Sequence, residues 1–338
     1  MSTVSRNGAY EVLDFTSLME LKPRMPTLLE RLGLFSDVDY GSTTIAQVER
    51  VKEGEDGIQA KARGADRNFA GREDAIQRNF NIPFFPLDSK FTAKEIQDLK
   101  AWGTTDVPMS MQDRVLRSTD RVVRSHQRSR ARAQYAALLG NSYSPGFKQA
   151  QYDYATEFGV SKKTFNVTFT DANTDPRATI ETEARRHIID NAQDGAGSYR
   201  IIALTGSAFF DALIAHPLVR ESYSQYNSDQ EPLRNRLGGD AVERTFTTQN
   251  ITYVEDIHPA DSGLAADKVI FIPLGIEDTL KTHYAPADTL KDANTTAKEM
   301  YLFMLSDGHR SEAVETETSM LVVNTRVELF PVGQAITS

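Results

Sequence analysis

The stretch MQDRVLRSTDRVVRSHQRSRARAQYAALL, residues 111–139, tells more about the fold than any other part of the sequence. It contains neither glycine nor proline, and Val115, Val122 and Leu138 or Leu139 recur near the helical period. We therefore predict one uninterrupted helix over 111–139, about 43 Å long at 1.5 Å per residue. A helix of this length is typical of a structural spine.

Arginines form a stripe on one face of this predicted helix. They recur at spacings of three and four residues, which places them on the same side: Arg114, Arg117, Arg121, Arg124 and Arg128. Arg130 and Arg132 extend the basic region, so 111–139 carries a net charge of +5 while the rest of the chain carries −14. Two interpretations stay open. Either the stripe forms ion pairs with acidic segments of its own or neighbouring chains, or it contacts DNA phosphates without base preference.

Two segments before the helix are predicted to form a long extended hairpin. Residues 42–52 and 75–85 favour strands, and the polar stretch 54–73 between them contains four glycines and no hydrophobic face. A two-stranded hairpin is marginally stable in water, so contacts outside its own domain, such as those of a neighbouring subunit, should hold it. The first 40 residues have only short apolar pieces and are interpreted as an arm that lies on another surface.

The remaining predicted elements are isolated helices and strands without regular alternation. The predicted helices cover 92–103, opened by a capping box at Thr92, then 175–195, opened by Asp175 and Pro176, and 207–215. The predicted strands cover 151–158, 164–169, 200–204, 245–254, 268–273, 301–305 and 322–330. This mixture indicates an α+β fold with mostly antiparallel sheets.

Composition limits the class of protein. The chain has 338 residues, of which 40% are hydrophobic and 25% charged, so one large or two medium domains can form. The formal charge of −9 argues against a surface built wholly to hold nucleic acid, and the absence of cysteine excludes disulfides and thiolate chemistry. The sequence has neither a signal peptide nor a long apolar run. We therefore expect a soluble protein, made in the cytoplasm, with no membrane contact.

A search of the sequence for catalytic, metal and cofactor sites is negative. The six histidines are dispersed and no glycine-rich phosphate loop is present, so we predict no metal and no cofactor. Ser207 and His216 are the least unfavourable pair for a soluble α+β hydrolase, but nine residues of helix separate them by about 13 Å, too far for proton transfer. We interpret Ser207 as a helix cap, and Glu315 and Glu317 as a solvent-facing pair. The sequence therefore predicts no enzyme activity.

Four stretches carry a resemblance to a known family, in its order and spacing. They are Phe80-Asn81-Ile82-Pro83 with Phe91-Thr92-Ala93-Lys94-Glu95-Ile96, then FFDALIAHPLVRESY at 209–223, Ile251-Thr252-Tyr253-Val254-Glu255, and Tyr284-Ala285-Pro286-Ala287-Asp288 with Asn294-Thr295. Through them the chain resembles the lambda capsid protein E family of tailed-bacteriophage major capsid proteins, over about residues 16–330. The sequence departs from the family at 318–321, where relatives often carry an Asn-Pro-Leu turn.

The resemblance implies the Hong Kong 97-type capsid fold. Its expected parts are an N-terminal arm (1–40), an extended loop (41–86), a peripheral domain with the spine helix (87–174), an axial domain (175–298) and return strands of both domains (299–338). It also implies a structural subunit that self-assembles into hexamers and pentamers, forming an icosahedral or prolate shell around double-stranded DNA. An encapsulin-type nanocompartment shell is the alternative.

The resemblance further implies where the protein acts and with what. The expected partners are other copies of the chain, a portal protein, a scaffold protein, a decoration protein, and packaged double-stranded DNA held by non-specific contacts. The expected location is the virion, after synthesis in the cytoplasm of the host bacterium. Some relatives crosslink a loop lysine to an asparagine. Lys52 and Lys61 are available, but nothing near them in the sequence shows the acid that would promote this reaction, so we expect no crosslink.

Overall fold

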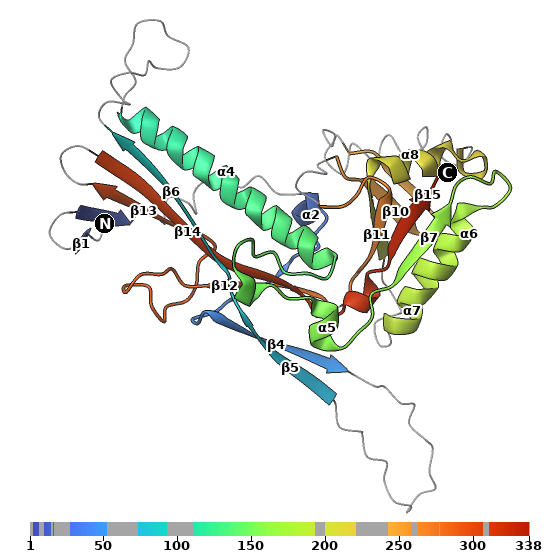
Figure 1. Cartoon of the computed structure of the whole chain (residues 1–338), viewed down its shortest axis with the longest axis horizontal. Coiled ribbons are helices and arrows are strands. Elements are labelled where there is room, and N and C mark those ends of the chain that lie inside the picture. The colour runs from blue at the N-terminus through green and yellow to red at the C-terminus, as the bar shows by residue number, and fades with distance from the viewer. Residues whose placement is uncertain are drawn as a thin grey trace, which may run out of the picture.

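Two sheets lie side by side in the computed structural model, each accompanied by helices, and a two-stranded hairpin projects away from them (Figure 1). The structure describes residues 3–6, 10–14, 16, 28–52, 74–92, 111–192, 200–220, 243–257, 263–276, 278–306 and 311–337. Helix α4 follows the length of the first sheet, and α6, α7 and α8 accompany the second.

The first sheet has seven strands. Their order is β1 (Thr3–Arg6), β2 (Tyr10–Asp14), β13 (Tyr301–Ser306), β14 (Ser311–Asn324), β12 (Leu280–Ala285) and β3 (Asp37–Tyr40), while β6 (Phe84–Thr92) pairs with β14. Three strands pair with β14, which makes it the organising strand of this sheet. Helix α4 (Met111–Leu138) packs on β14 and β6, which confirms the helix predicted over 111–139.

The second sheet has six strands. Their order is β7 (Thr164–Thr168), β15 (Val332–Ile336), β11 (Lys268–Leu274), β8 (Arg200–Thr205), β10 (Ile251–Glu255) and β9 (Thr245–Thr248). Its helices are α6 (Pro176–Ile180), the π-helical segment η2 (Glu181–Arg186), α7 (His187–Ala192) and α8 (Ser207–Ala215). Most pairs in both sheets are antiparallel, as predicted; the parallel ones are β8 with β10, β7 with β15, and β3 with β12.

Short elements connect the sheets and carry the hairpin. The hairpin consists of β4 (Ile45–Lys52) and β5 (Asp74–Asn81). The connecting elements are α2 (Leu28–Arg31), the 3₁₀ helix η1 (Lys148–Ala150), α5 (Tyr154–Phe158) and the 3₁₀ helix η3 (Val327–Leu329). Since η3 stands between β14 and β15, it is one of the points at which the chain passes from one sheet to the other.

The second sheet is buried on both faces because its central strands are continuously apolar. In β11, Ile270 and Ile272 belong to a large core shared with α4, β12 and β14, while Val269 and Phe271 belong to a second core with α6, α7 and α8. A strand with both faces buried needs an uninterrupted apolar run rather than an alternating one. This explains why the predictions for 200–204 and 268–273 are confirmed.

Four predicted strands are wrong in part or in whole. Residues 151–158 contain α5, with Asp153 as its N-cap and Gly159 at φ 65 as its C-cap. The segment 75–85 is divided between β5 and β6, and 322–330 contains the end of β14 followed by η3. The predicted strand 245–254 is a hairpin of β9 and β10.

Some predictions fall outside the described residues. Thr92 ends β6, and the rest of the helix predicted over 92–103 lies beyond the described part of the chain. The same holds for 54–73, which includes Lys61, and for the side chain of Lys52. The expectation of no crosslink therefore stays a prediction.

Candidate functional site

The arginine stripe lies on the side of α4 that faces away from the first sheet. Val122 and His126 are buried against the sheet, where the Nε2 atom of His126 lies 2.8 Å from the Oγ1 atom of Thr316 in β14. Arg117 is half-buried, and Arg114 lies in the first turn of the helix with a side chain outside the described set. The exposed members of the stripe are Arg121, Arg124 and Arg128.

The exposed arginines differ in their contacts. Within the described part of the chain, neither Arg121 nor Arg124 has an ion pair with an acidic side chain; the Nε atom of Arg124 donates to the backbone oxygen of Asp120 at 3.2 Å. Arg117 and Arg128 do make contacts within the chain. Pairing of Arg121 and Arg124 with a neighbouring chain, or their contact with DNA, stays a prediction.

Arg130, which extends the basic region in the sequence, does not lie on the exposed stripe. Its side chain is only 12% exposed, with the Nε atom 3.0 Å from Glu30 of α2 and the Nη1 atom 3.1 Å from Glu299. Burial lowers the pKa of Arg130, but its interactions with Tyr284, Glu30 and Glu299 outweigh burial and raise the pKa overall. Arg130 is thus a structural tie between the helix and the segment that precedes β3.

The hairpin is packed against the body at its root, residues 45–50 and 76–81. On the face directed inward, Ala46, Val48 and Phe80 are buried. The Phe80 ring meets three aromatic rings edge to face, with centroid distances of 4.8, 5.9 and 6.0 Å, from Tyr152, Tyr154 and Phe158. Edge-to-face aromatic pairs fix ring orientation as well as burying area, so this cluster sets the direction in which the hairpin leaves the body.

Polar contacts complete the hairpin root. An Nη2 atom of Arg50 lies 2.6 Å from Glu328 of η3, and both side chains are mostly buried, with 16% and 13% exposed. The Nε atom of Arg78 donates to the backbone oxygen of Glu157 at 2.9 Å. Removal of one member of such a buried ion pair leaves an uncompensated charge. Arg50 therefore ties the hairpin to the element that connects the two sheets.

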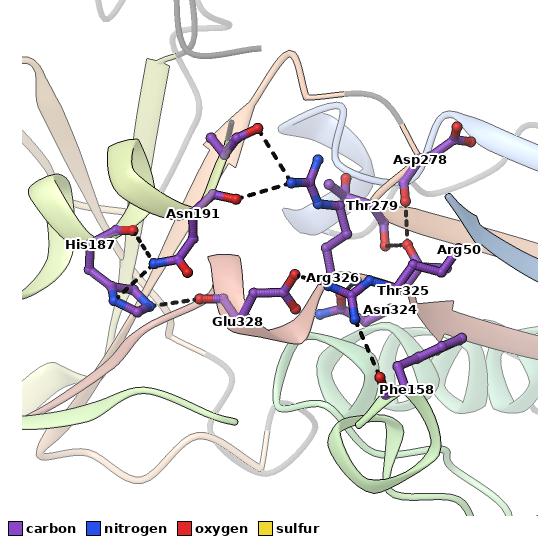
Figure 2. Close-up of polar contacts among 11 residues, drawn as sticks. Arg50, Phe158, His187, Asn191, Asp278, Thr279, Asn324, Thr325, Arg326 and Glu328 are labelled. Carbon is purple, nitrogen blue, oxygen red and sulfur yellow. Dashed lines mark hydrogen bonds and ion pairs between the residues drawn. The ribbon is translucent and has the colours of Figure 1, made fainter. Parts of the chain in front are cut away.

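The junction around η3 gathers contacts from both sheets (Figure 2). Arg326 donates to the backbone oxygens of Asn191 and Ala192 at 3.1 and 3.4 Å, which satisfies carbonyl groups at the end of α7. The Nε2 atom of His187 lies 3.0 Å from the backbone oxygen of Glu328, and Asn324 donates to Ala137 of α4 at 3.1 Å. Sequence reasoning missed these residues because none belongs to a motif.

The pair considered for a hydrolase is not assembled. Ser207 begins α8, whereas His216 is its C-cap and lies, through Nε2, 3.1 Å from the backbone oxygen of Asp171. The interpretation of Ser207 as a helix cap is wrong, because Gly206 occupies the N-cap position without a side-chain bond. A Cβ atom at Gly206 would lie 2.5 Å from two backbone oxygens of the neighbouring loop, so this position requires glycine.

The carboxylates Glu315 and Glu317 share a face of β14, as predicted, but they are half-buried rather than fully solvated. Burial raises the pKa of Glu317, and the negative charges of Asp288, Glu315 and Asp88 raise it further. The backbone N–H of Asp288 donates to Glu317 at 3.1 Å and opposes this shift. Acidic groups thus gather on this side of the sheet.

Two further findings concern the described ranges alone. No three side chains of histidine, aspartate or glutamate there are grouped so that they could hold a metal ion. None of the helices in those ranges combines the length and the apolar composition needed to cross a membrane.

Comparison with known proteins supports the fold and the family. The family model described as phage major capsid protein E matches residues 12–335. The major capsid protein of Pseudomonas phage KPP10 is 31% identical over 352 aligned positions, which cover 98% of each chain.

Two solved structures share the fold at low sequence identity. The head of Helicobacter pylori bacteriophage KHP40 gives a TM-score of 0.52 at 10% identity over 89% of this chain and 88% of that chain. The capsid asymmetric unit of cyanophage Pam1 gives 0.51 at 10% identity over 94% of this chain and 95% of that chain. The predicted α+β fold of the Hong Kong 97 type is confirmed. The encapsulin-type and hydrolase alternatives are set aside by the family match. The chain belongs to the phage major capsid protein E family and is a structural subunit of a phage capsid.

Proposed function

We propose that the chain self-assembles into hexamers and pentamers, which join into an icosahedral or prolate shell that encloses double-stranded DNA. The hairpin β4–β5 is the observation that carries this proposal. Its root is fixed to the body by the Phe80 ring cluster and the Arg50–Glu328 pair, while the strands continue away from both sheets (Figure 1). A long polar ribbon fixed at one end needs a second surface along its length.

The two faces of the hairpin have different roles. Successive side chains of a strand alternate between faces, and here one face is buried against α5 while the other is exposed. Ile45 is 51% exposed on that outer face. The remaining exposed side chains on it are polar: Gln47, Glu49, Gln77, Asn79 and Asn81. A neighbouring subunit that receives this face makes a head-to-tail contact, and repeated head-to-tail contacts close into rings.

We propose a division of the chain into parts that the two sheets follow only in outline, because β7, within 87–174, belongs to the second sheet and β12, within 175–298, belongs to the first. We assign 1–40 to an N-terminal arm, 41–86 to the extended loop, 87–174 to a peripheral domain and 175–298 to an axial domain. Residues 299–338 return through both, since β13 and β14 lie in the first sheet and β15 in the second. On this assignment α4 is the spine of the peripheral domain.

The proposal also states where the protein acts and which partners it has. The subunit is part of the virion, is made in the cytoplasm of the host bacterium and has no enzyme activity. Its partners are other copies of the chain, a portal protein, a scaffold protein, a decoration protein and the packaged DNA. Family membership supports shell assembly. The other partners are proposed because DNA must enter a closed shell and fill it.

Electron microscopy of the purified chain after gel filtration tests the assembly. Closed particles or ring-shaped capsomers are expected. Ile45→Asp should abolish them without loss of helical circular dichroism, because it places a charge on the outer face of the hairpin. Leu290→Asp is the matched control, since Leu290 is fully exposed on a turn far from the hairpin in sequence, and it should assemble normally. A wild-type chain that stays monomeric or dimeric with scaffold or crowding agents would contradict the proposal.

A further inference from the structure

The two sides of the first sheet carry charges of opposite sign. The arginine face is the outward side of α4, formed by Arg117, Arg121, Arg124 and Arg128. Asp120 is the acidic side chain exposed beside them in the described part of the helix. The contact between His126 and Thr316 fixes the opposite side of α4 on β14, so the arginine face turns away from the sheet.

The far side of the same sheet is acidic. Thr316 points toward α4, and alternate residues of a strand point to opposite faces, so Glu315 and Glu317 point away from the helix. Asp88 of β6 lies directly opposite Glu315 in the antiparallel register and shares its face. Asp288 contacts Glu317 from the loop that covers this side. Lys90 of β6 is an exposed basic side chain on the same side as Asp88. We call the four acidic residues the acidic sheet face.

A shell subunit presents one side to the enclosed genome and the other to the exterior. Double-stranded DNA carries about one negative charge per 1.7 Å of its axis, so a subunit side rich in carboxylates is repelled and a side rich in guanidinium groups is attracted. Arg121 and Arg124 suit this contact, because within the described residues no acidic side chain neutralises them. Arginine also forms bidentate hydrogen bonds with phosphate.

We infer that the arginine face is the inner side of the shell and binds the phosphates of packaged DNA, and that the acidic sheet face is the outer side. This inference rests on the proposed function, because it needs a closed shell. We expect no base preference, because the proposed contacts are to phosphates, which carry no sequence information. Each subunit contributes a weak contact, and the many copies of a shell add to a large effect.

The orientation can be tested by labelling, because the chain has no cysteine of its own. Ser125→Cys places a thiol on the arginine face, and Lys90→Cys places one on the side of Asp88; both positions are exposed. Intact DNA-filled particles are treated with a maleimide whose polymer chain is too large to cross the shell. Lys90→Cys should react, and Ser125→Cys should react only after the particles are opened with denaturant. Any other pattern of labelling overturns the orientation, whereas absence of particles would speak against the proposed function instead.

The DNA contact is tested with the double variant Arg121→Gln/Arg124→Gln and with Arg186→Gln, an exposed arginine beside the second sheet, as the matched control. The double variant should form empty shells as efficiently as the wild type but lose its genome at lower salt. For capsomers binding a random-sequence duplex, the slope of log K against log salt should fall by about 1.8, or 0.9 for each lost phosphate contact. The control should keep the wild-type slope.

Three outcomes overturn the DNA contact. An unchanged slope in the double variant shows that these arginines do not bind phosphate. Failure of the double variant to form empty shells assigns the arginines to ion pairs between subunits. Normal genome retention together with loss of an acidic internal protein from immature particles assigns the face to that protein.

Discussion

The two sheets differ in how much of their surface the chain itself covers. In the second sheet, β11 is buried on both faces, with Phe271 fully enclosed. In the first sheet, Phe91 is the buried side chain of β6, while Phe84 and Leu87 are 40% and 38% exposed. The chain itself covers both faces of β11, with α6, α7 and α8 on one face and α4, β12 and β14 on the other, whereas exposed residues of β6 gain burial from other chains. The molecule thus separates a self-sufficient part from a part that assembly completes.

The largest expected effect contrasts two phenylalanines. Phe271→Ala should lower the free energy of unfolding by about 3–5 kcal/mol, because the fully buried ring leaves a cavity. Phe84→Ala removes the same atoms from a partly exposed ring and should cost under about 1.5 kcal/mol. Urea unfolding of the unassembled chain, followed by circular dichroism, measures both. If both substitutions lowered the free energy of unfolding equally, the proposed difference between the sheets would be wrong.

The next effect tests whether the hairpin root belongs to the self-sufficient part. Arg50→Met should lower the free energy of unfolding by about 3 kcal/mol, because Glu328 would stay mostly buried without its charge partner. The double variant Arg50→Met/Glu328→Gln should recover most of the loss, since no unpaired charge remains. Arg78→Met, at an exposed arginine of the same root, is the control and should change stability little. The same urea titrations apply, and a double variant as unstable as Arg50→Met would refute the account.

Acidification should weaken the contact that joins α4 to the first sheet. Burial lowers the pKa of His126 from 6.5 to about 4. Between these pH values the unfolded chain binds a proton at this position that the folded chain does not. The free energy of unfolding therefore falls as the pH falls through this window, by up to about 3 kcal/mol. His126→Gln keeps a hydrogen-bond donor for Thr316 and removes this contribution. Unfolding free energies of both proteins at several pH values should converge toward acid, and parallel profiles would contradict the prediction.

The smallest expected effect concerns the acidic sheet face. Burial, followed by the charges of Asp288, Glu315 and Asp88, raises the pKa of Glu317, so its charged form is disfavoured in the folded chain. Glu317→Gln should therefore raise the melting temperature slightly at pH 7. At a pH low enough to protonate Glu317 in both the folded and the unfolded states, the difference should disappear. A lower melting temperature of the variant at pH 7 would show that the carboxylate has a stabilising partner.

The sequence predicted helices and strands correctly where the local pattern of residues is simple. Helix α4 lacks glycine and proline, and β8 and β11 are continuous apolar runs, so their local sequence determines their conformation. It failed at 151–158 because Tyr152, Tyr154 and Phe158 suggested a half-buried strand. The N-cap at Asp153 and the left-handed Gly159 were the signals that favoured a helix.

The candidate site could be predicted only in part. The spacing of the arginines determined that they share a helix face, but the exposure of that face depends on the position of β14. Arg130 is buried because Glu30 and Glu299 reach it from distant parts of the chain. Arg50 and Glu328 are 278 residues apart, so no local pattern relates them. Contacts of this kind follow from topology rather than from local sequence.

The positions of β14 and β15 also have a consequence for synthesis. Each lies inside its sheet, β14 beside β13, β12 and β6, and β15 between β7 and β11, and both come from residues 311–336. During translation neither sheet can close until this segment has left the ribosome, although earlier helices can already form. Nascent chains on one messenger therefore cannot present finished surfaces to one another, and association begins between chains whose translation has passed both strands.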